Sequence, residues 1–358
     1  MNTPAESSRS TLSYFTFAIS LTFVGLALSA VLGWYYHGTI SGMLSIFFIC
    51  SVLAVLEISL SFDNAIVNAN KLKTMRPEWR RRFLTWGIII AVFGMRIIFP
   101  LIIVMIGTGI GPIDAVELAA TQPDEYSRIM EESYLWISAF GGTFLLMVGL
   151  TYFFDEEKDV HWVAWIEEKV AASATIRGVE IALVLLIVLG VSSALGEELG
   201  SVFMRSAIIG LLTFLGVEIL GKVLDSTGEA ETGSGSGAMV TGGLGAFLYL
   251  EVLDASFSFD GVIGAFALSR NLFVIAIGLG IGALYVRSLT IMLVERESLS
   301  EYRFLEHGAF YAIIALSIAM YAQLFVHVPE VITGLGGATV IGLAFWSSLR
   351  WNKRNPGA

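Results

Sequence analysis

Ten apolar segments, each long enough to cross a lipid bilayer, constrain the fold of this chain more than any other feature. A membrane-spanning helix needs about 20 predominantly apolar residues. Such segments lie at residues 14–33, 43–69, 84–107, 134–154, 176–195, 201–224, 241–269, 272–294, 307–326 and 330–349. Only 15% of the 358 residues are charged, against about 25% in an average soluble domain. We therefore predict an all-α, polytopic membrane helix bundle of about ten spans, with nine as the alternative count.

The distribution of Lys and Arg predicts the orientation of the bundle. The loop after the second segment contains the basic residues Lys71, Lys73, Arg76, Arg80, Arg81 and Arg82. The loop after the third segment is acidic, and Arg128 is its single basic residue. Because cytoplasmic loops are enriched in Lys and Arg, we expect the loop after the second segment to lie in the cytoplasm. Ten spans that alternate in direction from this loop place the N and C termini in the cytoplasm as well. The net charge of −10 argues against nucleic acid as a partner and leaves the lipid bilayer as the expected environment.

Two acidic, Ser-rich segments of the chain resemble each other. Residues 57–66 read EISLSFDNAI, and residues 254–263 read DASFSFDGVI. Each copy contains an acid, two serines, a phenylalanine and an aspartate at the same spacing, and an arginine follows in the next apolar segment, Arg96 or Arg287. The copies lie five spans apart, so they cross the membrane in opposite directions. This pattern predicts inverted repeats related by a pseudo-two-fold axis in the membrane plane.

Composition divides the chain near its middle. Residues 225–238 read DSTGEAETGSGSGA, which is typical of a flexible linker. We predict an N-terminal half at residues 1–225, with the core of its repeat at 43–154, and a C-terminal half with the second repeat at 241–358. The Gly/Ser linker between the halves is expected at residues 226–240.

The acids of the two copies predict a cation site near the bilayer midplane. An ionised carboxylate at the membrane centre costs about 2.5–3.5 kcal/mol on insertion scales, and a bound cation would compensate for that cost. The predicted ligands are Glu57, Asp63, Asn64, Glu251, Asp254 and Asp260. Such an all-oxygen set suits Mn²⁺, Ca²⁺ or Mg²⁺. We expect the metal to be a transported substrate and expect no permanent cofactor.

The spacing of the acids also predicts broken helices. Residues six apart point about 120° away from each other on a regular helix, so Glu57 and Asp63 share a face only if the helix is interrupted between them. We expect such a break in both copies, with Ser61 and Ser258 as supporting residues that can bond to freed backbone groups. The negative charge of the predicted carboxylates exceeds the positive charge of one divalent ion, so protons could bind to the carboxylates when the ion leaves. Proton-coupled antiport is a corollary of this hypothesis.

Intramembrane arginines offer a different interpretation of the same acids. Arg96, Arg205 and Arg287 need anions, so the acids could form interhelical ion pairs with them. Within the cation hypothesis, Arg96 and Arg287 are supporting counter-charges or gating partners and not ligands. The roles of two further intramembrane acids, Glu180 and Glu218, stay open.

With these residues in view, the sequence resembles the TerC family of bacterial integral membrane proteins, within the wider LysE-like transporter superfamily. The first family element, Leu-Ser-x-Asp-Asn, is found at residues 60–64, and the second, Glu-x-x-Asp-x-x-Phe-x-x-Asp, at residues 251–260. An arginine in a Gly-rich span, at residues 94–96, also fits. The resemblance implies manganese export or a related divalent-cation flux, in the bacterial inner membrane, with links to tellurite resistance and to metal supply for secreted enzymes.

We therefore expect a secondary transporter of a divalent cation, with Mn²⁺ favoured over Ca²⁺. One alternative is an exporter of a small organic cation such as a basic amino acid, with Phe62 and Phe259 providing cation–π contacts. Another is a non-transporting membrane scaffold in stress or secretion. An enzyme is not expected, because no Ser/His dyad or His-rich metal motif lies within the spans. Homo-oligomerisation is left open.

Overall fold

The computed structural model describes residues 10–155, 158, 160–173, 176, 178–229, 243–296, 301–326 and 328–355. The side chains of residues 88, 224–229, 260, 330 and 331 lie outside this description. The described residues form helices and contain no strand, which confirms the predicted all-α class.

The long helices coincide with the predicted apolar segments. Among the described residues, eight segments are long and apolar enough to cross a membrane: α1 (Thr11–His37), α2 (Ile40–Leu60), Ile90–Thr108, α8 (Tyr134–Phe153), the part of α11 (Glu197–Glu229) up to Val223, α13 (Leu272–Glu295), α15 (Leu305–Ala322) and the part of α16 (Glu330–Arg354) from Ile332. The shorter apolar helix α10 (Val179–Leu195) and the acid-containing α12 (Leu244–Leu268) match the other two predictions. Exposed apolar side chains such as Phe23 and Leu186 cover the outside, as lipid contact requires. The chain is a multi-pass helical bundle.

Two of the predicted segments are built from several helices. The second contains α2 and α3 (Phe62–Lys73), and the third contains α4 (Pro77–Ile89), the π-helix η1 (Ile90–Ile98) and α5 (Phe99–Thr108). The sequence did not predict α6 (Pro112–Thr121) or α7 (Pro123–Glu132), and a further short helix, α9 (Ala164–Ser173), follows α8 in the chain. Helices α6 and α7 each begin with a proline and have acids in the first turn, which favours a helix start.

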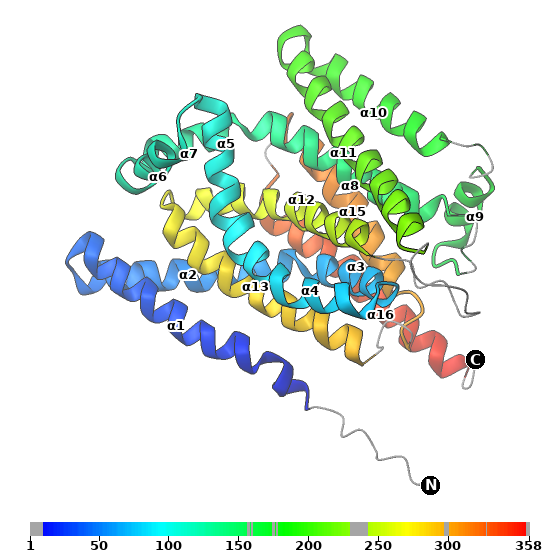
Figure 1. Cartoon of the computed structure of the whole chain (residues 1–358), viewed down its shortest axis with the longest axis horizontal. Coiled ribbons are helices and arrows are strands. Elements are labelled where there is room, and N and C mark those ends of the chain that lie inside the picture. The colour runs from blue at the N-terminus through cyan, green and yellow to red at the C-terminus, as the bar shows by residue number, and fades with distance from the viewer. Residues whose placement is uncertain are drawn as a thin grey trace.

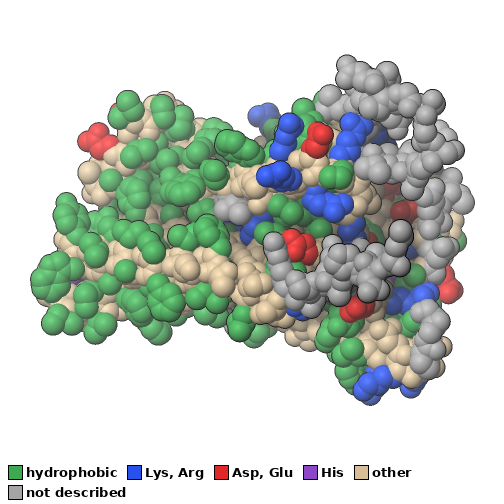
Figure 2. Space-filling view, turned by 60° about the horizontal axis from the view of Figure 1, so that its bottom comes forward, with side chains coloured by type: hydrophobic (Ala, Val, Ile, Leu, Met, Phe, Trp, Pro, Cys, Tyr) green, Lys and Arg blue, Asp and Glu red, His purple; other side chains and the backbone are tan. Residues whose placement is uncertain are grey.

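The two ends of the bundle differ in charge. The turn between α1 and α2, the helices α6 and α7, and the turn between α12 and α13 lie at one end, whereas α1 begins and α16 ends at the other (Figure 1). Lys and Arg side chains gather at this second end, and hydrophobic side chains cover the first (Figure 2). The described starts and ends of the chain therefore lie at the basic end of the molecule.

The two acidic copies run in opposite directions, as predicted. Helix α2 runs away from the α1–α2 turn, whereas α12 runs towards the same end of the molecule (Figure 1). The first copy is broken, because α2 ends at Leu60 and α3 begins at Phe62, with Ser61 between them at φ −102° and ψ 18°. The prediction of a break in the second copy was wrong, because α12 is one continuous helix through Ser258. Its local Ser256 hydroxyl bond to Val252 O, at 2.9 Å, is compatible with an intact helix.

The predicted linker overlaps the end of a helix. Helix α11 continues to Glu229, past the expected linker start at residue 226. The remainder of the predicted linker, residues 230–240, lies outside the described residues.

Close helix packing positions the first acidic copy. Helix α13 lies directly against α2, where a Cβ atom added at Gly278 would be 2.6 Å from Leu53 Cβ and 3.1 Å from Cys50 O. Only a residue without a side chain permits this approach of two backbones. The contact holds the C-terminal part of α2 against α13, next to the buried acids.

Candidate functional site

The break at Ser61 gives Glu57 and Asp63 different surroundings. Ser61 closes the last turn of α2 by donating its backbone N–H to Glu57 O at 3.0 Å, and its hydroxyl donates to Glu57 Oε1 at 3.1 Å. Asp63 lies in the first turn of α3, where the helix dipole favours a negative charge. Its Oδ1 accepts the Asn64 N–H at 2.8 Å. The Glu57 and Asp63 residues are only 2% and 5% exposed, so both carboxylates need compensation for lost water.

Glu57 is compensated by an arginine of the π-helix. The buried guanidinium of Arg96 forms an ion pair with Glu57 Oε1 and also donates to Ala91 O in the preceding turn of η1. A π-helix of this length is rare, and such segments frequently mark functional sites. The interpretation of the acids as interhelical ion pairs is therefore confirmed for Glu57, while Arg205 is an exposed residue of α11.

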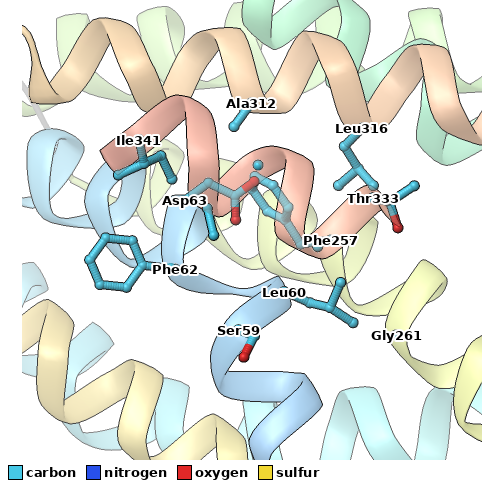
Figure 3. A pocket seen from close by; sticks show the side chains of 13 residues that line it. Ser59, Leu60, Phe62, Asp63, Phe257, Gly261, Ala312, Leu316, Thr333 and Ile341 are labelled. Atoms are coloured by element: carbon cyan, nitrogen blue, oxygen red, sulfur yellow. The ribbon is translucent and has the colours of Figure 1, made fainter. Parts of the chain in front are cut away.

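Asp63 faces a separate, small cavity. The cavity has a volume of about 20 Å³ and lies between the α2–α3 break, α12, α15 and α16. Ser59, Phe257, Gly261 and Thr333 are among the residues that line it, and Asp63 points into its centre beside Phe257 (Figure 3). Among the described residues, no Lys, Arg or His forms an ion pair with Asp63. Its buried charge therefore lacks a cationic partner in the described part of the protein.

A second cavity, of about 30 Å³, contains most of the remaining polar groups. It is lined by Glu57, Asn64, Asn68, Arg96, Asp254 and Arg287, together with smaller side chains. Asp254 Oδ1 accepts a hydrogen bond from Asn68 Nδ2 at 2.6 Å, which joins α3 to α12. The Oδ1 atoms of Asn64 and Asn68 and the Nε atom of Arg96 are buried without hydrogen-bond partners. Unpaired donors and acceptors at one place are typical of a site that takes water or a polar ligand.

Arg287 and Glu251 are buried charged residues, and several of their side-chain nitrogen and oxygen atoms have no hydrogen-bond partner. The guanidinium of Arg287 lies over the Phe83 ring, 3.9 Å from its centroid, and its Nε and Nη2 have no partner. Both carboxylate oxygens of Glu251 also lack partners. Gly87 lies beside both groups, because a Cβ there would be 2.6 Å from Arg287 Nη2 and 3.1 Å from Glu251 Oε1. A side chain at Gly87 would enter the space next to these two charges.

The structure therefore divides the predicted ligands. Glu57, Asn64 and Asp254 share one cavity, Asp63 lines the other, and Glu251 lines neither. The side chain of Asp260 lies outside the described part of the chain. No three acidic, His or Cys side chains among the described residues are grouped so that they could hold a metal ion.

The predicted supporting residue Ser258 is buried, and its Oγ has no hydrogen-bond partner.

Two residues of the site, Asn68 and Thr333, were not predicted from the sequence. Asn68, which bonds to Asp254, was not predicted, although it lies four positions after Asn64 and therefore on the same helix face. Thr333 was also missed, because only the tertiary fold brings the start of α16 to the Asp63 cavity.

A further buried carboxylate lies outside the membrane spans. Glu167 of α9 accepts hydrogen bonds from Lys158 Nζ at 2.9 Å, from Val163 N at 3.0 Å and from Tyr311 OH at 3.1 Å. His307 Nε2 lies 3.4 Å from its Oε2. Burial alone would raise the pKa of Glu167, but the Val163 N–H, Lys158 and the neighbouring positive charges outweigh burial and hold the pKa below its usual value. This ionised group fastens α9 to α15.

Comparisons with known proteins give one match. No curated protein and no solved structure matches the chain. A family model described as "Protein of unknown function (DUF475)" matches residues 62–355, which include α3 with Asp63 and the whole second acidic copy. Because the match covers most of the chain, this protein belongs to the DUF475 family.

Proposed function

We propose that this protein is a secondary transporter of a divalent metal cation, with Mn²⁺ favoured over Ca²⁺, acting as an exporter in a bacterial inner membrane. The observation that carries the proposal is the buried Asp63 carboxylate, which lies at a helix break and has no ion-pair partner among the described residues. An uncompensated carboxylate in a membrane protein costs several kcal/mol, by order of magnitude, and a substrate cation would supply the missing charge.

The donor atoms around Asp63 suit a hard cation. Ser59 and Thr333 provide hydroxyl oxygens at the same cavity, and the interrupted backbone at Ser61 is the kind of irregular segment that supplies carbonyl ligands in transporters. Oxygen ligands of this kind bind Mn²⁺, Ca²⁺ and Mg²⁺ in preference to softer ions. Glu57 and Asp254 would contribute further charge if they exchanged their present partners, Arg96 and Asn68, for the cation.

The size of the cavities favours an inorganic ion over an organic cation. Their volumes of about 20 and 30 Å³ leave room for a particle the size of a water molecule, which needs about 10–15 Å³ on this measure. Phe259 was expected to contact an organic cation, yet its ring stacks on Phe99 with centroids 4.4 Å apart and lies in an apolar cluster. Cavities of this size have no room for an amino-acid side chain.

The resemblance to the TerC family agrees with this proposal and adds the expected direction of transport. Cytoplasmic N and C termini would place the basic end of the molecule in the cytoplasm, in accordance with the positive-inside rule. Proton coupling is part of the proposal, because protons can replace the cation on surplus carboxylates.

The proposal is tested by flux measurements in proteoliposomes. Purified protein is reconstituted, and Mn²⁺ and Ca²⁺ uptake and release are followed with and without a pH gradient. The parent is compared with Asp63→Asn and with Glu180→Gln, a control in α10, which packs on α8 and α11 away from the two cavities. We expect the Asp63 variant to lose flux and the Glu180 variant to keep it. Metal binding without any flux would support a scaffold, and inhibition of Mn²⁺ flux by lysine would support the organic-cation alternative.

A further inference from the structure

The two repeats contain equivalent pairs of an acid and an arginine, and the pairs differ in state. Glu57 and Asp254 occupy the same position in the two copies, and Arg96 and Arg287 follow in the next apolar segment of each half. Arg96 is bonded directly to Glu57. Arg287, in contrast, makes no ion pair with any described residue, and Asp254 is bonded to Asn68. The Glu57–Arg96 pair is therefore formed, and we call it the closed pair. The Asp254–Arg287 pair is not formed, and we call it the open pair.

The backbone shows the same difference between the halves. In the first half, the acidic helix is interrupted at Ser61 and Arg96 lies in the π-helix η1. In the second half, α12 and α13 are continuous α-helices. Sequences that are alike in both copies therefore adopt two conformations within one molecule.

We propose that the two pairs exchange states during the transport cycle: Arg287 pairs with Asp254 when Arg96 releases Glu57, and the reverse. Transporters with inverted repeats change the side to which they open when the repeats rearrange relative to each other. The exchange rests on the proposed transport function, although not on the identity of the substrate. Arg96 and Arg287 are then positioning residues that favour opposite conformations.

The contacts of the open pair suit a temporary arrangement. Asp254 and Arg287 line the same cavity as Glu57 and Arg96, so both pairs border one polar space. The Phe83 ring holds the Arg287 guanidinium through a cation–π contact. Asn68 supplies the hydrogen bond that Arg287 would otherwise give to Asp254. Asp254 therefore has a neutral hydrogen-bond partner, and Arg287 lies against an aromatic ring with the Glu251 carboxylate also beside Gly87, which limits the cost of separating the pair.

The test measures the accessibility of one engineered cysteine. Cys50 is the only cysteine of the chain, so Cys50→Ala gives a cysteine-free background. Thr333→Cys then places a thiol at the Asp63 cavity, and its reaction rate with a membrane-impermeant maleimide is measured from each side of the membrane. The rates are compared among this background, Arg96→Gln and Arg287→Gln. Arg205→Gln is the control, because Arg205 is exposed on α11.

The exchange predicts opposite effects of the two substitutions. Loss of a buried charge partner changes a conformational equilibrium by about tenfold or more. We expect Arg96→Gln to change the ratio of the two labelling rates in one direction, Arg287→Gln to change it in the other, and Arg205→Gln to leave it unchanged. Changes of the same sign, or no change, would overturn the exchange. If the Gln variants do not fold, Arg96→Lys and Arg287→Lys replace them, with the same opposite signs and smaller size expected.

The labelling experiment is independent of the flux experiment. Opposite accessibility changes without Mn²⁺ or Ca²⁺ flux would retain the exchange and overturn the proposed substrate. Flux that depends on Asp63, without opposite accessibility changes, would retain the transport function and overturn the exchange.

Discussion

Gly282 of α13 lies directly against Glu57 of α2, so close that a Cβ atom on Gly282 would be 2.4 Å from Glu57 Cβ and 2.8 Å from Ala54 O. Real side chains do not approach a neighbouring Cβ or carbonyl to these distances. The backbone of α13 therefore determines how far Glu57 can move, and the packing of two apolar helices is connected to the position of a buried charge.

Substitution of Gly282 by alanine should disturb this contact. We expect Gly282→Ala to lower the thermal stability of the detergent-solubilised protein, because overpacking of a close helix contact costs about 1–3 kcal/mol. The melting temperature is measured by intrinsic fluorescence. Gly280→Ala is the matched control, since its Cβ would meet only Val92 Cγ1 at 3.4 Å. Equal melting temperatures for the two variants would contradict the prediction.

Removal of the Asn68 amide should destabilise the protein through Asp254. In Asn68→Ala, the buried Asp254 carboxylate loses its 2.6 Å hydrogen bond, and bonds to charged groups contribute about 1.5–3 kcal/mol. The free energy of unfolding is measured by denaturant titration in detergent. Asn352→Ala removes an exposed amide bonded to Glu301 O at 2.7 Å and should have a smaller effect. The prediction fails if the exposed substitution is as costly as the buried one.

Two Lys–Glu pairs of similar length allow burial to be compared. The side chains of Lys158 and Glu167 are 8% and 1% exposed, whereas those of Lys222 and Glu218 are 76% and 37% exposed. Breaking a buried pair leaves an uncompensated charge, while an exposed pair contributes about 0–1 kcal/mol. We expect Lys158→Met to lower the melting temperature by several degrees and Lys222→Met to leave it nearly unchanged. A larger loss in the Lys222 variant would contradict the burial argument.

The stability contribution of Glu167 should depend on pH. Its folded-state pKa is lower than the usual value of 4.5, so its contribution is complete above that value and is lost as the pH falls through the folded-state pKa. Melting temperatures of the parent and Glu167→Gln are compared at intervals between pH 7 and pH 4. We expect a constant difference at neutral pH and a smaller one at the acidic end. A difference that grows on acidification would show that the sign of the pKa change is wrong.

The sequence predicted the parts of this fold that depend on local composition. All ten apolar segments correspond to helices, and the break beside Ser61 followed from the six-residue spacing of Glu57 and Asp63. The equivalent break in α12 was not found, because the backbone of this helix stays regular over the whole second copy.

Features that depend on tertiary contacts could not be predicted in the same way. The pairing of Glu57 with Arg96, 39 residues later in the chain, was one of two open interpretations until the helices were placed in space. The π-helix around Arg96 could not be predicted from its composition, because apart from Arg96 its residues are those of an ordinary apolar membrane span. The division of the acids between two cavities depends on the positions of α15 and α16, which their own sequences do not reveal.

The location of Thr11, where α1 begins, and Arg354, where α16 ends, at the same end of the bundle has a practical consequence. Fusion partners attached before α1 and after α16 would emerge into one compartment. If one fragment of a split fluorescent protein is fused before α1 and the other after α16, the two fragments should reassemble within a single molecule. Fluorescence would then report that the polypeptide has inserted correctly.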